Sequence, residues 1–326
     1  MAKTKKRRLK KSVKITIAVL FVILISTIVY ASFKVGAFDK PTPEEGKIKD
    51  IVVQDSKLDF EDEGEFKYSE ETLKFTVLDV GQGQSIFIDY GNFECLIDAG
   101  PVAAGEGVSK KIKPYVDGDI ELAIATHSDE DHIGGFSQVF RDYTVNKTIY
   151  GNLGETKAAK IFEKEARAEG EFAEDSDMII ELGPNAQLTI FDVEDDNKEN
   201  INANSVITLI SFGETNFFAS GDATKEVERQ LRGKLPEVDV VVAGHHGSSD
   251  CNSLIDILNP QYFVISCGKG NEYGHPHKEV IEAVRQTRAD ILGTWINGDI
   301  TFESDGISVN YKVEKADILT EEELGY

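Results

Sequence analysis

The side chains best suited to chemistry lie in four short polar segments, each of which follows an apolar run. We call them the four polar loops: residues 126–135 (THSDEDHIGG), 219–224 (ASGDAT), 244–249 (GHHGSS) and 273–277 (YGHPH). Three of them hold all six histidines of the 326-residue chain. Imidazole and carboxylate groups are the ligands that borderline and hard divalent cations prefer, so this distribution predicts a metal centre.

The first polar loop has the densest set of candidate ligands. His127, Asp129, Asp131 and His132 fall within six residues, with Glu130 between them. At this spacing the four side chains cannot all point one way from a regular strand or helix, but they can converge from a loop. The alternative is a polar helix cap, in which an aspartate accepts backbone N–H bonds. A cap does not account for two of the six histidines, so we predict metal binding here.

The other three polar loops carry weaker signals when each is taken alone. Asp222 opens a predicted helix and would ordinarily be an N-cap, but a carboxylate has two oxygens and can bridge two cations. The pair His245 and His246 is flanked by glycines at the end of a buried strand, which favours ligation over packing. His275 and His277 surround a proline, and solvated loop histidines remain the alternative there.

Short β-rich runs and intervening helices must position these loops. We predict strands at residues 73–80, 85–90, 93–100, 121–126, 178–182, 188–193, 206–213, 216–220, 238–244, 262–268, 291–298 and 299–311. Helices are predicted at residues 109–116, 133–143, 155–168, 224–231 and 278–288. Strands and helices do not alternate strictly, which favours a layered α/β sandwich over a doubly wound sheet.

The N-terminus differs in composition from the rest of the chain. Residues 1–14 are basic, and residues 15–33 are apolar and uncharged, long enough to cross the hydrocarbon core of a bilayer. The basic side should stay in the cytoplasm, so we predict a single-pass signal-anchor with the remainder outside the cell. A cleaved signal peptide is the alternative. Residues 34–70 read as an acidic linker, 71–312 as the globular domain and 313–326 as an acidic tail.

Charge and cysteine content narrow the classes of function. Beyond residue 38 the chain has 26 basic and 58 acidic residues, a net charge of −32. This argues against a broad basic surface that coats nucleic acid. Hydrophobic residues make up 40% of the chain and charged residues 29%, which excludes wholesale disorder. Three cysteines exclude a disulfide framework, and the oligomeric state stays open.

Seven motifs in order resemble the metallo-β-lactamase superfamily, and within it the ComEC-like branch found at the end of competence DNA-uptake proteins. The motifs are DVGQGQ (79–84), LIDAG (96–100), HSDEDHIGG (127–135), NANS (202–205), GD (221–222), HHGS (245–248) and YGHP (273–276). The similarity covers residues 73–311. It implies a four-layer αββα sandwich and a hydrolase that uses two divalent ions, Zn²⁺ or Mn²⁺.

The resemblance also implies roles for the strongest candidates. His127 and Asp129 would hold one metal, and Asp131 and His132 the other. Asp222 would bridge the two ions, and with Asp131 it is a predicted catalytic carboxylate. Two cations close together lower the pKa of a shared water and clamp the oxygens of a phosphodiester, so we expect hydrolysis by metal-activated water.

The remaining candidates have supporting roles in the same scheme. His245 or His246 would complete the ligand set, and Asp98 would orient a ligand from behind. Oxyanion contacts or protonation of the leaving group would come from Ser248, Asn204 and His275. Loop hydrogen bonding is the alternative for each of these three residues.

Two departures from the family pattern bear on these expectations. Gln84 stands where the branch usually has aspartate. No histidine lies between His132 and His245, so the middle metal-binding histidine of the superfamily is absent, which would weaken Zn²⁺ binding or favour Mn²⁺. The polytopic channel of the competence proteins has no counterpart here, so we do not expect this chain to form the DNA pore.

We therefore expect an extracytoplasmic, membrane-anchored phosphodiesterase or nuclease that acts on DNA or a cell-wall polymer. A phosphorylcholine-esterase-like cell-wall enzyme is one alternative, because a related branch has that activity. A non-enzymatic surface protein with a vestigial metal site is the other. β-Lactam hydrolysis is disfavoured, because that chemistry normally uses the missing middle histidine.

Overall fold

A computed structural model describes residues 53–54, 71–193 and 200–317 of the chain. The predicted basic segment, the apolar span at 15–33 and most of the acidic linker and tail lie outside these residues. Within the part that is described, no helix is both long and apolar enough to cross a membrane.

One eight-stranded sheet is built mainly from the first half of the domain, in the order β16-β15-β2-β3-β4-β5-β6-β7. Neighbours are antiparallel from β16 to β4 and parallel from β4 to β7. The strands are β2 (Leu73–Val77), β3 (Ile86–Tyr90), β4 (Phe93–Ile97), β5 (Ile120–Ala125), β6 (Val145–Tyr150), β7 (Glu171–Glu174), β15 (Ile300–Ser304) and β16 (Val309–Val313).

The second eight-stranded sheet has the order β1-β8-β9-β10-β11-β12-β13-β14. Neighbours are antiparallel from β1 to β11 and parallel from β11 to β14. Its strands are β1 (Val53–Gln54), β8 (Met178–Gly183), β9 (Ala186–Phe191), β10 (Ile207–Phe212), β11 (Thr215–Ala219), β12 (Val240–Val242), β13 (Tyr262–Ile265) and β14 (Asp290–Gly293).

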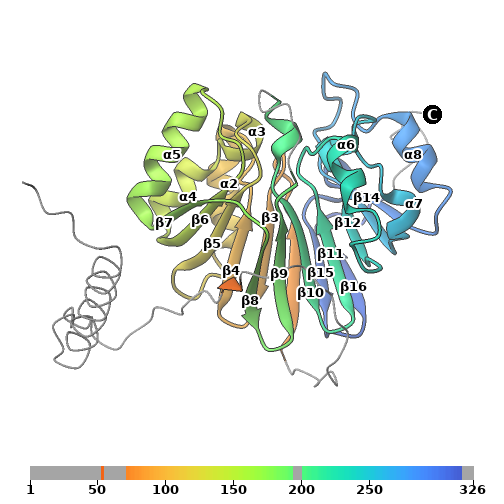
Figure 1. Cartoon of the computed structure of the whole chain (residues 1–326), viewed down its shortest axis with the longest axis horizontal. Helices are drawn as coiled ribbons and strands as arrows, with labels where there is room; N and C mark the ends of the chain where they lie inside the picture. The colour runs from red at the N-terminus through yellow and green to blue at the C-terminus, as the bar shows by residue number, and fades with distance from the viewer. Residues whose placement is uncertain (1–52, 55–70, 194–199, 318–326) are drawn as a thin grey trace, which may run out of the picture. The chain divides into compact units, whose positions relative to one another are not determined.

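Helices cover the outer faces of both sheets, α2, α4 and α5 on one side and α6, α7 and α8 on the other (Figure 1). The helices are α2 (Gly105–Ile112), α3 (Glu130–Ile133), α4 (Phe136–Asp142), α5 (Lys157–Glu169), α6 (Lys225–Glu228), α7 (Ile255–Leu258), α8 (Lys278–Val284) and α9 (Thr294–Asn297). Short 3-10 turns are η1 (Val102–Ala104), η2 (Asn202–Asn204), η3 (Arg229–Leu231) and η4 (Gly244–Gly247).

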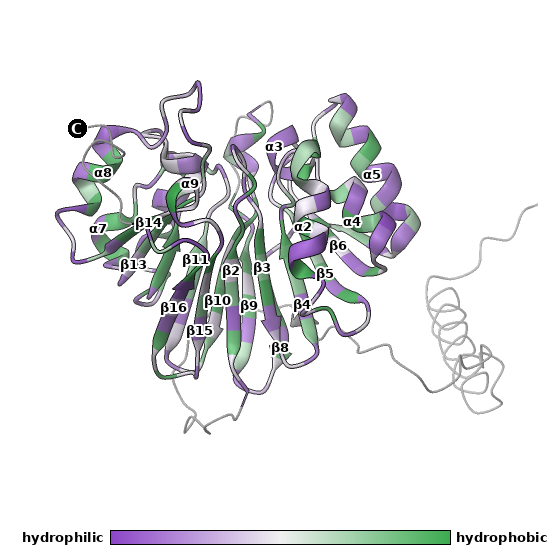
Figure 2. Cartoon of the chain, turned by 180° about the vertical axis from the view of Figure 1, so that it is seen from behind, coloured by the Kyte–Doolittle hydropathy of each residue, from purple (hydrophilic) through white to green (hydrophobic). Residues whose placement is uncertain are grey.

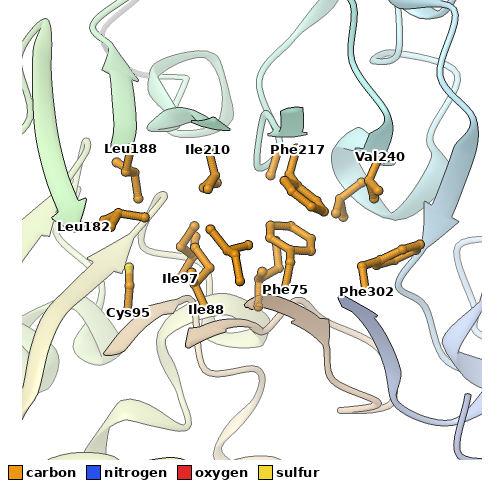
Figure 3. Close-up of a cluster of buried hydrophobic side chains, with 14 of the residues drawn as sticks. Phe75, Ile88, Cys95, Ile97, Leu182, Leu188, Ile210, Phe217, Val240 and Phe302 are labelled. Carbon is orange, nitrogen blue, oxygen red and sulfur yellow. The ribbon is translucent and has the colours of Figure 1, made fainter. Parts of the chain in front are cut away.

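Three apolar layers hold the sandwich together. Between the sheets, Phe75 stacks on Phe217 with ring centroids 5.0 Å apart, and side chains of the two sheets meet face to face (Figure 3). A second cluster lies between β9–β13 and helices α6–α8, and a third between β3–β6 and helices α2–α5. Apolar residues thus line the inner side of each helix and both faces of the central strands, while polar residues line the outside (Figure 2). The predicted layered α/β sandwich is confirmed.

Parallel pairing explains why the polar loops gather at one place. Ile97 of β4 pairs with Ile124 of β5, and Ala219, Val242 and Val264 are aligned across β11, β12 and β13. The carboxyl ends of parallel strands share one edge of a sheet, so the segments that follow them emerge together. The first sheet therefore delivers the polar loop at 126–135, and the second sheet delivers the other three, all from the carboxyl ends of parallel strands.

Some predicted elements differ from the structure. The apolar run at 291–298 is a strand only as far as Gly293, where the Asn297 side chain accepts a bond from the Gly293 N–H and the chain turns into helix α9. Strands β6 and β7 were not predicted, because their sequences VNKTIY and EFAE are too polar to stand out. The helix predicted at 109–116 begins four residues earlier, at Gly105.

Candidate metal centre

Three histidines at the centre are oriented by hydrogen bonds from behind. The His132 Nδ1 lies 2.7 Å from the Asp98 carboxylate, and the His246 Nδ1 lies 2.9 Å from the carbonyl oxygen of Ser266. Both partners only accept, so each Nδ1 carries the hydrogen. The His127 Nδ1 lies 3.1 Å from the Thr126 hydroxyl oxygen, whose own hydrogen goes to Asp98 at 2.7 Å. In all three rings the Nε2 atom faces the centre.

The Nε2 atoms converge with two carboxylates. The His132 Nε2 lies 3.3 Å from both the Asp222 Oδ1 and the His246 Nε2. The Asp131 Oδ2 is 3.2 Å from the His246 Nε2, and the Asp222 Oδ2 is 3.7 Å from the His127 Nε2. Two overlapping ligand groups result, one of His127, His132 and Asp222 and one of Asp131, His132 and His246. His132 therefore belongs to both groups, where we expected it to serve one metal.

The arrangement fits divalent cations. The Nε2 atoms of His132 and His246 lie 3.3 Å apart, a distance at which they share a hydrogen or lie beside a common cation. Among the described residues, several buried side-chain atoms without a hydrogen-bond partner belong to the polar loops: His127 Nε2, Ser128 Oγ, Asp222 Oδ1, Thr224 Oγ1 and His275 Nδ1. Buried polar atoms are normally satisfied, and His127 and Asp222 belong to one ligand group, so their two orphan atoms indicate a cation that satisfies them.

Electrostatics keep the carboxylates of the centre ionised. Burial alone would raise the pKa of Asp222, but the neighbouring His132, His246 and His127 hold that pKa well below its usual range. Burial is likewise outweighed at Asp131, where the bond to His246 and the charge of His132 lower the pKa to about 2. Burial would lower the pKa of His132, but Asp222 and Asp98 raise it well above its usual range. Both carboxylates can therefore ligate a cation at neutral pH.

The Asp98 carboxylate accepts several hydrogen bonds behind the ligand groups. Its backbone is left-handed at φ 56°, and its fully buried carboxylate accepts bonds from the Thr126 N–H at 2.8 Å and the Gln84 side-chain amide at 2.9 Å, in addition to His132. The role of Gln84 was not foreseen from the sequence, nor were those of Ser266 and Thr126. The only available signal was that Thr126 directly precedes His127.

His245 and His246 occupy different environments although they are adjacent. Both have a left-handed backbone, at φ 48° and 56°, which is costly for residues with a side chain and is found at functional sites. His246 is 3% exposed and lies within the ligand group, whereas the His245 side chain is 32% exposed and its Nε2 lies 3.4 Å from the Asp222 Oδ2. Asp129 stands at the solvent side, 3.5 Å from the His127 Nε2, and its side chain is 44% exposed.

The three predicted supporting residues, His275, Ser248 and Asn204, have different surroundings. The His275 ring lies 5.5 Å from that of His245, beside the ligands. The Ser248 hydroxyl accepts from the Asp250 N–H within its own turn. The Asn204 amide donates to the Asn200 carbonyl, and it is the next residue, Ser205, whose hydroxyl accepts from the Asp222 N–H at 3.2 Å. Of these three side chains, the His275 ring is the one that lies against histidine rings of the centre, those of His245 and His246.

A hollow of about 220 Å³ has Ser205 in its lining, the residue whose hydroxyl accepts from the Asp222 N–H. Its walls are polar and acidic, with carboxylates from Glu174, Asp175 and Asp192 and the side chains of Tyr150 and Asn152.

Residues 78–268 match the metallo-beta-lactamase superfamily, and the chain belongs to that superfamily. The curated relatives are competence and recombination proteins. ComE operon protein 3 of Bacillus subtilis is 28% identical over 257 residues, which cover 69% of this chain and 32% of that protein. Competence protein ComA of Neisseria gonorrhoeae is 30% identical over 235 residues, which cover 70% of this chain and 32% of that protein. The predicted ComEC-like resemblance is thus confirmed.

The chain spans about a third of the length of these curated relatives. Recombination protein 2 of Haemophilus influenzae fits the same pattern, with 27% identity over 244 residues, 71% of this chain and 29% of that protein. Among solved structures, the metallo-beta-lactamase fold protein YhfI from Bacillus subtilis has a TM-score of 0.51 at 11% identity, over 72% of this chain and 100% of that chain. That likeness concerns the fold alone.

Proposed function

We propose that the chain is a metal-dependent phosphodiesterase whose substrate is DNA. The observation that carries the proposal is the convergence of three buried Nε2 atoms on Asp131 and Asp222, with orphan acceptors that need cations. Bound divalent ions would supply an acidified water and neutralise the charge of the phosphodiester. The competence relatives support DNA as the substrate, because all three carry names from DNA uptake or recombination.

The chain's own residues have separable tasks in this reaction. His132, His246 and His127 would hold the ions through Nε2. Asp222 belongs to the first ligand group and lies 3.9 Å from the His246 Nε2 of the second. Burial and the neighbouring His245, His246 and His277 lower the pKa of His275 to about 4, so its ring is neutral at pH 7. A neutral imidazole still has one N–H, and His275 would donate that bond to a phosphate oxygen or to the leaving group.

A ranking of variants tests the proposal. Hydrolysis of bis-p-nitrophenyl phosphate by the full-length chain would be measured at saturating Mn²⁺ and at saturating Zn²⁺. His127→Ala and Asp131→Ala should lower the rate by several powers of ten, since each removes a ligand from a different group. His275→Ala should cost roughly 10²- to 10⁴-fold, the usual share of one acid–base or oxyanion contact.

Cys251→Ala is the matched control, because its buried thiol lies near the centre and makes only a long contact of 3.7 Å to the Asp222 carbonyl oxygen. It should stay near the wild-type rate. A wild-type chain that binds metal and is inert on every diester would contradict the proposal and favour a non-enzymatic surface protein. Equal, mild losses across the four variants would mean that the centre is elsewhere.

The acidic hollow favours a second candidate, an esterase for phosphorylcholine groups of a cell-wall polymer. Carboxylates of Glu174, Asp175 and Asp192 would attract a cationic group and repel a polyanion. p-Nitrophenyl phosphorylcholine, assayed beside the diester, separates the two. This candidate would replace the first if the phosphorylcholine ester had the higher kcat/KM of the two substrates. Glu174→Gln and Asp192→Asn should then raise KM for that ester and leave KM for the diester unchanged.

A further inference from the structure

An exposed aromatic ring stands beside the metal centre with no role in the scheme above. Tyr273 is 58% exposed, more than any other aromatic side chain among the described residues. Its ring stacks on His275, with centroids 5.7 Å apart and planes at 23°, and the His275 ring in turn meets that of His245 at 5.5 Å. His245 reaches Asp222 at 3.4 Å. One imidazole therefore separates Tyr273 from the candidate ligands.

The loop that carries Tyr273 is held in place although its ring is exposed. The Asn271 amide donates to the carbonyl oxygens of Gly268 at 3.0 Å and His275 at 2.7 Å, and the Asn271 Oδ1 accepts from the His275 N–H at 3.0 Å. The His277 Nε2 donates to the Tyr273 carbonyl at 3.3 Å, while its Nδ1 accepts from the Ser249 N–H of the polar loop at 244–249 at 2.9 Å. A ring that is ordered before binding loses little entropy when a ligand stacks on it.

The geometry suits a flat partner next to a phosphate. His275 covers one face of Tyr273, so the exposed part of the ring includes its other face. Tyr273 is separated from His245 by the single ring of His275, with steps of 5.7 and 5.5 Å between ring centroids.

We propose that Tyr273, backed by His275, is a stacking platform for the nucleobase next to the phosphate held at the metal centre, so that the site accepts single-stranded nucleic acid. This inference rests on the proposed phosphodiesterase function. A quaternary ammonium is the competing occupant, but cations of that kind are recognised by cages of several aromatic rings, whereas Tyr273 offers one open face. Any of the nucleobases can stack on a single aromatic ring.

Equilibrium binding tests the inference without turnover. The full-length chain would be titrated, by fluorescence anisotropy, into a phosphorothioate oligothymidylate of twelve nucleotides and into an abasic oligomer of the same length and charge. The wild type should bind the oligothymidylate about 5- to 150-fold more tightly, the range expected for one stacked base. Tyr273→Ala should remove this preference, and Tyr273→Phe, which keeps the ring, should retain it.

Tyr115→Ala is the matched control, because Tyr115 is also exposed, at 40%, but packs against Phe87 on the α2 side of the sandwich. It should keep the preference. Metal content of each variant would be measured to show that the centre is intact. Equal affinity of the wild type for both oligomers, or a preference that survives Tyr273→Ala, would overturn the inference. So would displacement of the oligothymidylate by phosphorylcholine at lower concentration than by thymidine monophosphate.

A kinetic comparison keeps this inference distinguishable from the proposed function. The ratio of kcat/KM for thymidine 5′-(p-nitrophenyl phosphate) to that for methyl p-nitrophenyl phosphate should exceed one and fall 5- to 150-fold in Tyr273→Ala. A chain that hydrolyses both diesters equally well would keep the proposed function and overturn the platform. A chain that hydrolyses neither diester, yet shows the Tyr273-dependent binding preference, would support the platform and overturn the proposed function.

Discussion

Three side chains donate hydrogen bonds to the buried carboxylate of Asp98, and through His132 they control the centre. Thr126 donates from both its N–H and its hydroxyl, Gln84 donates from its amide, and His132 donates from Nδ1. These bonds hold Asp98 in one position and so fix the direction of the His132 Nε2. Groups that orient a ligand from behind affect metal affinity strongly although they never touch the ion.

At this scale the sharpest prediction concerns Gln84. Gln84→Ala removes one donor to Asp98 and should weaken metal affinity by about 10- to 100-fold. Gln84→Glu should be worse than alanine, because it places a second carboxylate 2.9 Å from that of Asp98. Affinity would be measured by competition with a chromogenic chelator.

Two further variants give a large expected loss of bound metal and no expected loss, for comparison with the Gln84 variants. Asp222→Ala removes a carboxylate that belongs to the first ligand group and lies 3.9 Å from the His246 Nε2 of the second, and it should lose more than half of the bound metal. Gln138→Ala, in the exposed face of α4, should bind metal like the wild type. Unchanged affinity in both Gln84 variants would mean that Asp98 needs only Thr126 and its backbone to stay in place.

At the scale of single elements, strands β4 and β5 carry an unusual acidic pair far from the polar loops. Glu94, near the start of β4, is fully buried and both of its carboxylate oxygens lack a hydrogen-bond partner. Its backbone N–H donates to Glu121 of β5 at 2.9 Å. Burial, followed by the charges of Glu121, Asp117 and Asp89, raises the pKa of Glu94 to about 8. The folded sheet therefore holds a proton that the unfolded chain releases.

This proton makes stability depend on pH in a stated direction. Between about pH 4.5 and 8 the native state binds more protons than the unfolded state, so the free energy of unfolding falls as pH rises and levels off above 8. Glu94→Gln keeps a neutral side chain at every pH and should flatten this fall. At pH 8 it should stabilise the chain on the order of 3 kcal/mol, or about 6–12 °C in Tm.

Thermal unfolding of both proteins at pH 5 and pH 8 checks the prediction, with little difference expected at pH 5. Glu279→Gln, on the exposed face of α8, is the control and should follow the wild type at both values. A Glu94→Gln variant that is less stable than the wild type at pH 8 would mean that Glu94 is ionised and paired in the folded sheet.

At the scale of the whole molecule, each sheet supplies half of the centre. The β4–β7 side brings Asp98, His127, Asp131 and His132, while the β11–β14 side brings Asp222, His245 and His246. The GQGQ turn joins the two, since Gly83 accepts from Ser266 of one side and Gln84 binds Asp98 and the Asp131 carbonyl of the other. Residue 83 must be glycine there, because a side chain would clash with the Asp131 carbonyl oxygen.

We also expect the chain to be anchored in the cell membrane with residues 71–317 outside the cell. The basic segment before the apolar run at 15–33 motivates this topology. Protease added to intact cells should remove the globular domain and spare the N-terminus, whereas protease added after lysis should digest both. Full protection of the domain in intact cells would contradict the anchor, and a domain free in the medium would favour a cleaved signal peptide.

Residue types and their order were sufficient to predict the class of chemistry. Six histidines in three loops, each after an apolar run, predicted a metal centre, and the order of seven motifs predicted the superfamily. The strands with long apolar runs were also predictable, because a strand that is buried on both faces has a continuous apolar sequence. Strands β6 and β7 were missed because their sequences are polar, although only β7 lies at the edge of its sheet.

Only the tertiary structure decided how the candidates are grouped. Sequence neighbours suggested pairs within the first polar loop, yet His132 meets Asp222 and His246 from the other sheet. The structure places His246 among the ligands and leaves His245 partly exposed. It also places the Asn204 side chain against the nearby Asn200 carbonyl. It also revealed Gln84 as a partner of Asp98. Such contacts join residues far apart in the chain, so they depend on sheet register and loop conformation, which local sequence does not encode.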